Sequence, residues 1–120
     1  MPSVLIIDEA PLRIRWLESV LQSMGWQWQC CGMQAESLPG TDITLLALHL
    51  RQGNGFEFAT VLREQGHGSI WLLSDWPCET DALWARSLGL AGVLRVPAPV
   101  EDFCALLQAS LEDCHEDASA

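Results

Sequence analysis

The sequence is poor in positive charge. It has six basic residues against sixteen acidic ones, which gives a formal net charge of −10, and the basic residues form no cluster. Proteins that bind nucleic acids contact the phosphates through basic side chains, so direct binding to DNA or RNA is not expected. The same negative charge predicts repulsion from an anionic membrane surface.

Long apolar runs are missing as well. No stretch approaches the roughly 18 consecutive apolar residues that a membrane-spanning helix needs. The first residues, MPSVLIIDEAP, have no basic start and reach an acid at Asp8, which is unlike a secretory signal peptide. We therefore expect a cytoplasmic protein that does not bind a membrane.

Cysteine pairs with metal-binding spacing are also absent. The odd number of cysteines and the lack of a C-x-x-C pair or a histidine-rich spacing argue against a zinc site. The pattern predicts reduced thiols, several of them buried as small apolar groups. The cysteines are Cys30, Cys31, Cys78, Cys104 and Cys114.

The composition is that of a globular protein. The chain has 120 residues, of which 49% are apolar and 18% are charged, so one domain with a real core is expected. The residues after Leu111 are polar and end the chain, where fraying is common. We therefore expect a domain at 1–112 and a flexible acidic tail at 113–120, without internal repeats or linkers.

The hydrophobic pattern predicts strands that alternate with helices. This alternation implies a parallel sheet that is covered by helices on both faces. In such sheets, functional residues gather beyond the carboxyl ends of the strands. Strands are predicted at 4–7, 26–31, 43–48, 70–73 and 93–96, and helices at 11–24, 36–38, 56–64, 79–88 and 100–111.

The chain resembles the receiver domain of response regulators, the CheY-like superfamily. Four segments carry the resemblance, and they occur in the order that the family has: VLIIDEAPLRIRWLESVLQSMGW, DITLLALHLRQGNGFEFATVLRE, GSIWLLSD and LGLAGVLRVPAP. The similarity covers residues 3 to 111. It implies a flavodoxin-like (βα)5 doubly wound parallel sheet with strand order 2-1-3-4-5 in three layers.

The resemblance also implies a phosphorylation site, of which this chain has lost a part. In the family, two acids after the first strand and an aspartate after the third strand hold Mg²⁺. That aspartate takes a phosphoryl group from a histidine kinase, and a hydroxyl and a lysine hold the phosphoryl oxygens. Asp8 and Glu9 match the acidic pair and Ser74 matches the hydroxyl, but the acceptor position is Ala47 and the lysine position is Val96.

The two replacements predict a degenerate receiver that is not an enzyme. Alanine has no nucleophile, so no acyl phosphate can form at Ala47. A lysine in place of Val96 would have fewer anionic partners once the acceptor aspartate is gone, so burying it would cost more. Asp8 and Glu9 alone would attract Mg²⁺ only weakly, so no cofactor is expected. The simpler interpretation of the two acids is a solvated acidic lip.

Tryptophan is frequent, with six residues, whereas tyrosine is absent. Core packing accounts for Trp71, but Trp76 and Trp84 are harder to bury. In receivers, the fourth helix, fifth strand and fifth helix form the usual docking face, and exposed tryptophans there would be good anchors. Trp84 suits a core and an interface equally. The residues expected on this face are Trp84, Val93, Arg95 and Phe103.

Three hypotheses for the function follow. The leading one is a receiver-like domain of two-component phosphorelay signal transduction that works independently of phosphorylation, as a protein–protein interaction module. Its partner would be a histidine kinase, an output protein or a second copy of the chain. The second is a phosphorylatable receiver with a displaced acceptor near Ser74 or Asp75, or at His49. The third is a small flavodoxin-like ligand-binding protein, although an acidic loop after the first strand is unsuited to binding a phosphate.

Overall fold

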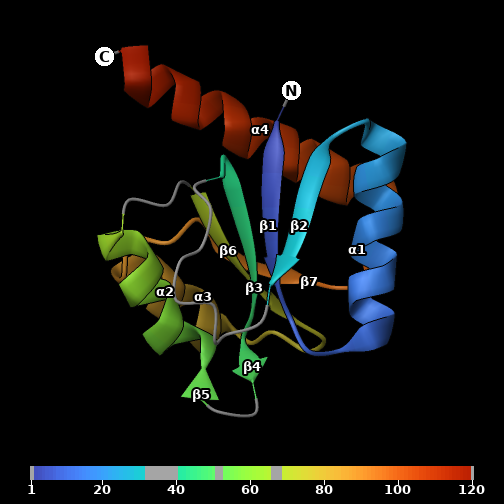
Figure 1. The fold of residues 1–120 in the computed structure, drawn as a ribbon. Coiled ribbons are helices and arrows are strands. Elements are labelled where there is room, and N and C mark those ends of the chain that lie inside the picture. Colours follow the sequence, from blue (N-terminus) through green and yellow to red (C-terminus); the bar gives the residue numbers. More distant parts are fainter. Residues whose placement is uncertain (1, 32–40, 51–52, 66–68, 120) are drawn as a thin grey trace.

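The central sheet has the predicted topology. The computed structural model describes residues 2–31, 41–50, 53–65 and 69–119, and within them five parallel strands lie in the order β2-β1-β3-β6-β7 (Figure 1). Numbered along the chain within this sheet, the order is 2-1-3-4-5, so the doubly wound arrangement is confirmed. The strands are β1 (Ser3–Ile7), β2 (Gln27–Cys31), β3 (Ile43–Ala47), β6 (Ser69–Ser74) and β7 (Gly92–Arg95).

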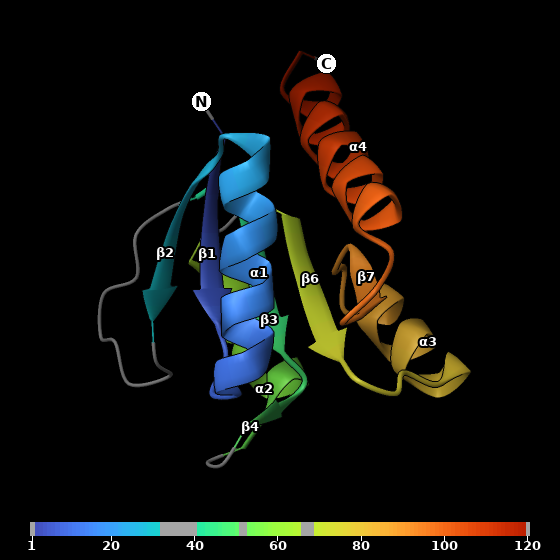
Figure 2. The same cartoon turned by 90° about the vertical axis from the view of Figure 1, so that its right-hand side faces the viewer.

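Helices cover both faces of the sheet, which confirms the three layers. One face carries α1 (Pro11–Met24) and α4 (Val100–Ser119), and the other carries α2 (Gly55–Glu64) and α3 (Glu79–Ser87), as Figures 1 and 2 show. Each face has its own cluster of buried apolar side chains. The short helix predicted at 36–38 lies outside the described residues.

The local sequence explains where α1 begins and ends. Pro11 stands at the start of the helix, where its missing N–H is no loss. Gly25 ends the helix with φ +74°, a left-handed conformation that glycine adopts without strain, and its N–H caps the carbonyls of Leu21 and Gln22. Between these points, Leu17, Val20 and Leu21 face the sheet and are buried.

Trp71 and Phe103 belong to the core beneath α1 and α4. Trp71 is partly buried against this cluster, and its Nε1 donates a hydrogen bond of 3.1 Å to Ser110 Oγ. Phe103 is 1% exposed and meets Trp16 edge to face, with 5.1 Å between the ring centroids. The expectation of a core position for Trp71 therefore holds, whereas Phe103 is not available at the surface.

A short antiparallel ribbon precedes α2. β4 (His49–Leu50) pairs with β5 (Gly53–Asn54), and the N–H of Gly55 donates to the carbonyl of Leu48 at 2.7 Å. A Cβ on Gly55 would stand 2.6 Å from the carbonyl oxygen of Ala47. Glycine is needed here because the start of α2 lies directly against the end of β3.

The last helix is longer than predicted. α4 continues to Ser119, past the expected end at Leu111, because residues 101–119 contain neither glycine nor proline to stop it. The helix thus crosses the boundary between the domain and the tail expected at 113–120, and that division stays a prediction. Within the described part of the chain, no helix is long and apolar enough to cross a bilayer.

The described cysteines are less buried than expected. Cys30 and Cys78 are exposed and Cys104 is partly buried. Cys30 lies on β2, at the edge of the sheet, and Cys78 precedes α3 at the surface, so neither position is enclosed by a helix layer. Among the cysteines that the structure describes, none is fully buried, so the expectation that several cysteines are buried finds no support there.

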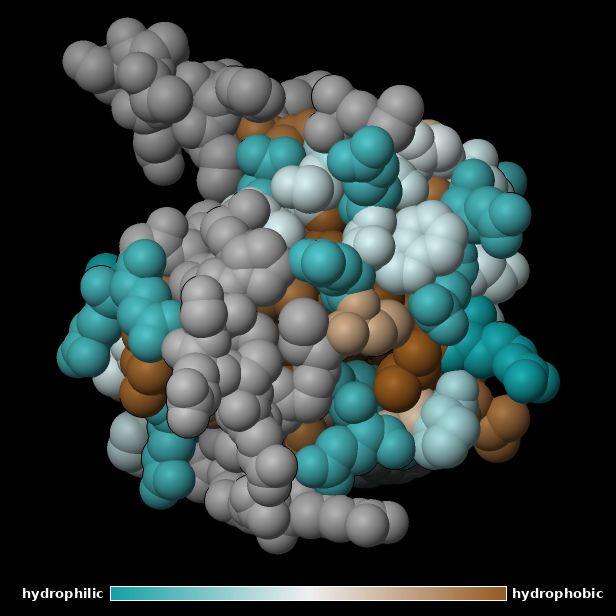
Figure 3. Space-filling view, viewed as in Figure 1, coloured by the Kyte–Doolittle hydropathy of each residue, from teal (hydrophilic) through white to brown (hydrophobic). Residues whose placement is uncertain are grey.

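Large apolar side chains reach the surface in separate places. On the face shown in Figure 3, the hydrophobic residues (brown) form small patches between hydrophilic ones (teal). Isolated apolar residues of this kind are normal, and only grouped ones indicate a binding surface. The exposed large hydrophobic residues are Leu12, Val61, Trp76, Leu83, Trp84, Val100 and Leu106.

Candidate functional site

The carboxyl edge of the sheet brings four of the predicted site residues together. β1, β3, β6 and β7 are neighbours in the sheet and point the same way, so their ends carry Asp8, Ala47, Ser74 and Val96 to one edge. The N–H of Val96 donates to the carbonyl of Ser74 at 3.1 Å, which continues the pairing of β6 and β7 past the last strand residue.

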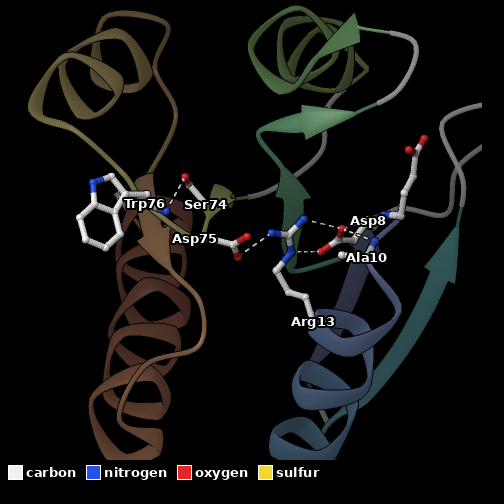
Figure 4. A network of polar contacts seen from close by, with 7 residues as sticks. Asp8, Ala10, Arg13, Ser74, Asp75 and Trp76 are labelled. Carbon is white, nitrogen blue, oxygen red and sulfur yellow. Dashed lines mark hydrogen bonds and ion pairs between the residues drawn. The ribbon is translucent and has the colours of Figure 1, made fainter.

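Asp8 is a buried hydrogen-bond acceptor. Its side chain is 1% exposed, and its Oδ1 accepts the backbone N–H groups of Glu9 at 2.7 Å and of Ala10 at 3.0 Å. The guanidinium of Arg13 binds the same carboxylate through two nitrogens: Nη2 donates to Oδ1 at 2.8 Å, and Nε donates to Oδ2 (Figure 4). The solvated acidic lip is therefore wrong for Asp8, although Glu9 is exposed.

Arg13 joins two loops that are far apart in the sequence. Its third nitrogen, Nη1, donates to Asp75 Oδ1 at 3.0 Å, so one guanidinium bridges the end of β1 and the loop after β6 (Figure 4). The Arg13 side chain is 12% exposed, and that of Asp75 is 76% exposed. The hydrogen bond to Asp8 raises the pKa of Arg13 above its ordinary value, with a smaller contribution from Asp75, against the lowering effect of burial. Arg13 was not among the residues predicted for this site.

The acceptor and lysine positions of the receiver pattern are closed apolar sites. Ala47 and Val96 are both fully buried. The start of α2 presses against the backbone of Ala47, as the contact at Gly55 shows. All six basic residues of the sequence are arginines, so no lysine exists to take the place that Val96 leaves. Among the described residues, Arg13 is the cation that binds Asp8 at this edge.

The hydroxyl of Ser74 serves its own loop. Ser74 is 3% exposed, and its Oγ accepts the backbone N–H of Trp76 at 3.2 Å. Trp76 itself is 80% exposed, and the guanidinium of Arg95 lies over its ring, 5.1 Å from the centroid. His49, on β4, is exposed.

A cavity of about 500 Å³ lies beside the Arg13–Asp75 pair. Apart from this pair, the residues that line it are mainly apolar, namely Ala10, Leu12, Trp16, Val96 and Pro97. Arg13 already spends three nitrogens on carboxylates. The cavity therefore offers a phosphoryl group the remaining guanidinium N–H groups and the indole N–H of Trp16, and it contains no lysine.

The residues at this edge do not fit a magnesium ion. Mg²⁺ needs carboxylate oxygens that are free to face it. Both oxygens of Asp8 are occupied by Arg13 or by backbone N–H groups. Within the described ranges, no three His, Cys, Asp or Glu side chains gather as metal ligands would. The guanidinium of Arg13 occupies the Asp8 carboxylate, which a magnesium ion would need as a ligand.

The four residues expected on one docking face do not form one surface. Trp84 is 58% exposed, and its ring lies 6.5 Å from that of Phe56, so it is on the side of α3 that faces α2. Val93 is partly buried against the core beneath α2 and α3. Phe103 belongs to the opposite core, and its placement on the surface was wrong. Only Trp84 and Arg95 are exposed.

The sequence matches no protein-family model and no curated protein. The fold, in contrast, is similar to that of solved receiver domains. The chemotaxis protein CheY4 of Vibrio cholerae is 20% identical, with a TM-score of 0.80 over 92% of this chain and 98% of that one. A two-component response regulator from Clostridium difficile is 19% identical, with a TM-score of 0.82 over 93% of this chain and 97% of that one.

A third similar structure contains a metal. The receiver domain of a sensor histidine kinase from Pseudomonas aeruginosa, solved with a magnesium ion coordinated in its active-site cleft, is 18% identical. Its TM-score is 0.78, over 92% of this chain and 98% of that one. At identities this low the comparison establishes the fold alone: the chain has the fold of response-regulator receiver domains.

Proposed function

We propose that this chain is a receiver-fold signalling module of the two-component type that acts by binding proteins and does not accept a phosphoryl group. The observation that carries the proposal is the bridge from Asp8 through Arg13 to Asp75, beside the closed apolar positions of Ala47 and Val96. The similarity of the fold to receiver domains supports the signalling role.

The bridge bears on phosphorylation because Arg13 neutralises a carboxylate that would otherwise attract a metal ion. A cluster of carboxylates without a cation binds a metal to relieve its charge. Here Arg13 supplies a permanent positive charge with two hydrogen bonds to Asp8, a geometry that guanidinium groups favour for carboxylates. The charge of Asp8 is thus offset without Mg²⁺, and Ala47 supplies no nucleophile, so we expect no phosphoryl transfer at this site.

A module of this kind has no chemical switch of its own. Without an acyl phosphate, only a partner that binds one conformation better than another can shift the population of its states. We propose a histidine kinase or an output protein as this partner, with a second copy of the chain as the other possibility.

The displaced-acceptor hypothesis has less support. Asp75 is an exposed carboxylate beside the site, but it is bound to Arg13. Ser74 is buried and its oxygen accepts a backbone hydrogen bond. A relocated acceptor would also need a metal to bring in the phosphodonor, and the described residues do not provide a set of ligands for it.

Intact-mass spectrometry after incubation with acetyl phosphate and Mg²⁺ tests the proposal. We expect no phosphoryl adduct, whereas a conventional receiver in the same tube serves as the positive control. The Asp75→Asn variant is run in parallel. An adduct on the wild-type chain would overturn the proposal, and its loss in Asp75→Asn would identify Asp75 as a displaced acceptor.

Titration with Mg²⁺, followed by calorimetry, tests the role of Arg13 directly. The wild-type chain is expected to show no specific heat of binding, because Asp8 has no free oxygen facing solvent. In Arg13→Ala, the carboxylate loses its cation, and Mg²⁺ binding should become detectable. Saturable binding to the wild-type chain that Arg13→Ala leaves unchanged would contradict this account.

A further inference from the structure

A continuous groove runs between α2 and α3 on the side of the sheet away from α1. Two adjoining cavities, of about 470 and about 350 Å³, share Thr60 and Leu88 and together extend along both helices. They reach from Phe56 in the first turn of α2 to Glu64 at its end. Ten helical residues rise about 15 Å, so the groove is long enough for about three turns of another helix.

The groove has an apolar centre that the described part of the chain leaves partly exposed. The rings of Phe56 and Trp84 lie 6.5 Å apart at a tilt of 55°, and Leu88 lines the groove beside them. Trp84 is 58% exposed although it lies against a concave surface. A large aromatic ring that is half exposed next to a cavity is the kind of residue that anchors a partner.

The rim of the groove is negatively charged. Among the described residues that line it, Glu57, Glu64 and Asp81 are acidic and Arg63 alone is basic. Arg63 is committed to the end of α3, where its Nη1 donates to the carbonyl of Leu88 at 2.6 Å. The rim therefore carries a net negative charge, as does the whole chain at −10.

We propose that the groove between α2 and α3 docks a positively charged, amphipathic segment of another protein, which inserts an apolar side chain beside Trp84. This inference rests on the proposed function as a protein-binding module and names the chemistry of its partner. Lysine or arginine side chains along the segment would meet the acidic rim, and the apolar face would cover Phe56 and Trp84, as amphipathic helices do in such grooves. A second copy of the chain is disfavoured because two copies at −10 each repel one another.

Nuclear magnetic resonance with two designed peptides tests this proposal. One peptide is an amphipathic helix with leucines on one face and lysines on the other, and its control has glutamate at every lysine position. We expect the lysine peptide to shift the indole signal of Trp84 and the backbone signals of α2 and α3. The glutamate peptide should leave them unchanged, because the rim repels it.

Matched variants decide whether the binding belongs to the groove. Trp84→Ala should weaken binding of the lysine peptide by about tenfold or more, since a central tryptophan commonly dominates an interface. Trp76→Ala removes an even more exposed tryptophan, which lies in the loop after β6 and outside the groove, and it should leave the affinity unchanged. Glu64→Lys, at an exposed position, should weaken binding without removing any apolar contact.

Several results would overturn the proposal. They are equal binding of both peptides, shifts that lie outside α2 and α3, an affinity that Trp84→Ala does not change, or a dimer that this variant dissolves. This outcome is separable from the proposed function. A domain that binds no peptide and takes no phosphoryl group refutes only the groove, whereas a phosphorylated domain refutes the proposed function whether or not a peptide binds.

Discussion

Replacing Arg13 by methionine would show how much the bridge at the carboxyl edge contributes to the fold. Methionine keeps an unbranched apolar stem and removes the guanidinium. The change leaves the Asp8 carboxylate, whose side chain is 1% exposed, with only the N–H groups of Glu9 and Ala10 as partners. The charge then stays buried without its counter-ion.

The expected cost follows from this loss. Removing one partner of a buried ion pair typically destabilises a protein by about 3–5 kcal/mol. Asp8 keeps two backbone hydrogen bonds, which places the loss nearer to about 2–3 kcal/mol. In a domain of this size, that corresponds to a fall in Tm of roughly 6–12 °C.

Thermal unfolding followed by circular dichroism measures this difference, and two controls interpret it. Asp75→Asn removes the exposed end of the bridge and should cost at most about 1 kcal/mol. The double variant Asp8→Asn, Arg13→Met removes the buried charge as well, so it should be more stable than Arg13→Met alone. An Arg13→Met protein with the wild-type Tm would refute the reasoning. So would a double variant whose fall in Tm equals the sum of the falls in Asp8→Asn alone and Arg13→Met alone.

Two further predictions concern pH and backbone packing. The pKa of Arg13 is raised, chiefly by Asp8, so its stabilising contribution is fully present below the ordinary arginine pKa and is lost only above the raised value. The difference in Tm between the wild-type chain and Arg13→Met should thus stay constant from about pH 7 to about pH 10, and a shrinking difference would count against it. Gly55→Ala should lower Tm more than Gly25→Ala in the same scans, because its Cβ would stand 2.6 Å from a backbone oxygen, whereas at Gly25 nothing lies within 4 Å and only the φ of +74° is strained.

The sequence was sufficient for the framework of the fold because its strands are long apolar runs between clear stops. Residues 43–47 are all buried and read as a strand from composition alone, and Gly25 ends a helix by a conformation that few other residues adopt. The β4–β5 ribbon escaped prediction because each strand has two residues, too few to show a period of two. The predicted end of the last helix, at Leu111, came too early because the polar composition after it was taken as a sign of fraying.

Arg13 was missed although the sequence carries a signal for it. The first turn of α1 contains this base and no acid, which opposes the positive end of the helix dipole. A base in that position needs an anionic partner to compensate, and the acids at the end of β1 precede it by four and five residues. That Asp75 would be the second partner could not be read from the sequence, because it follows 62 residues later.

The choice of Phe103 for the docking face was wrong because the apolar residues alone do not encode which side of a helix faces its neighbours. On α4, Phe103 and Leu107 are buried while Leu106 is 43% exposed, and the pattern leaves open which of them faces out. Trp84 was correctly predicted to be hard to bury. The helix beside it, which contributes Phe56, became known only from the packing of α2 against α3.

The bridge formed by Arg13 also has a consequence for time. An acyl phosphate hydrolyses spontaneously, so the lifetime of a phosphorylated receiver is limited by the rate of this hydrolysis. The ion pairs between Asp8, Arg13 and Asp75 contain no bond that hydrolysis could break, so they do not decay with time. The module that we propose would mark the duration of a signal through how long its partner stays bound.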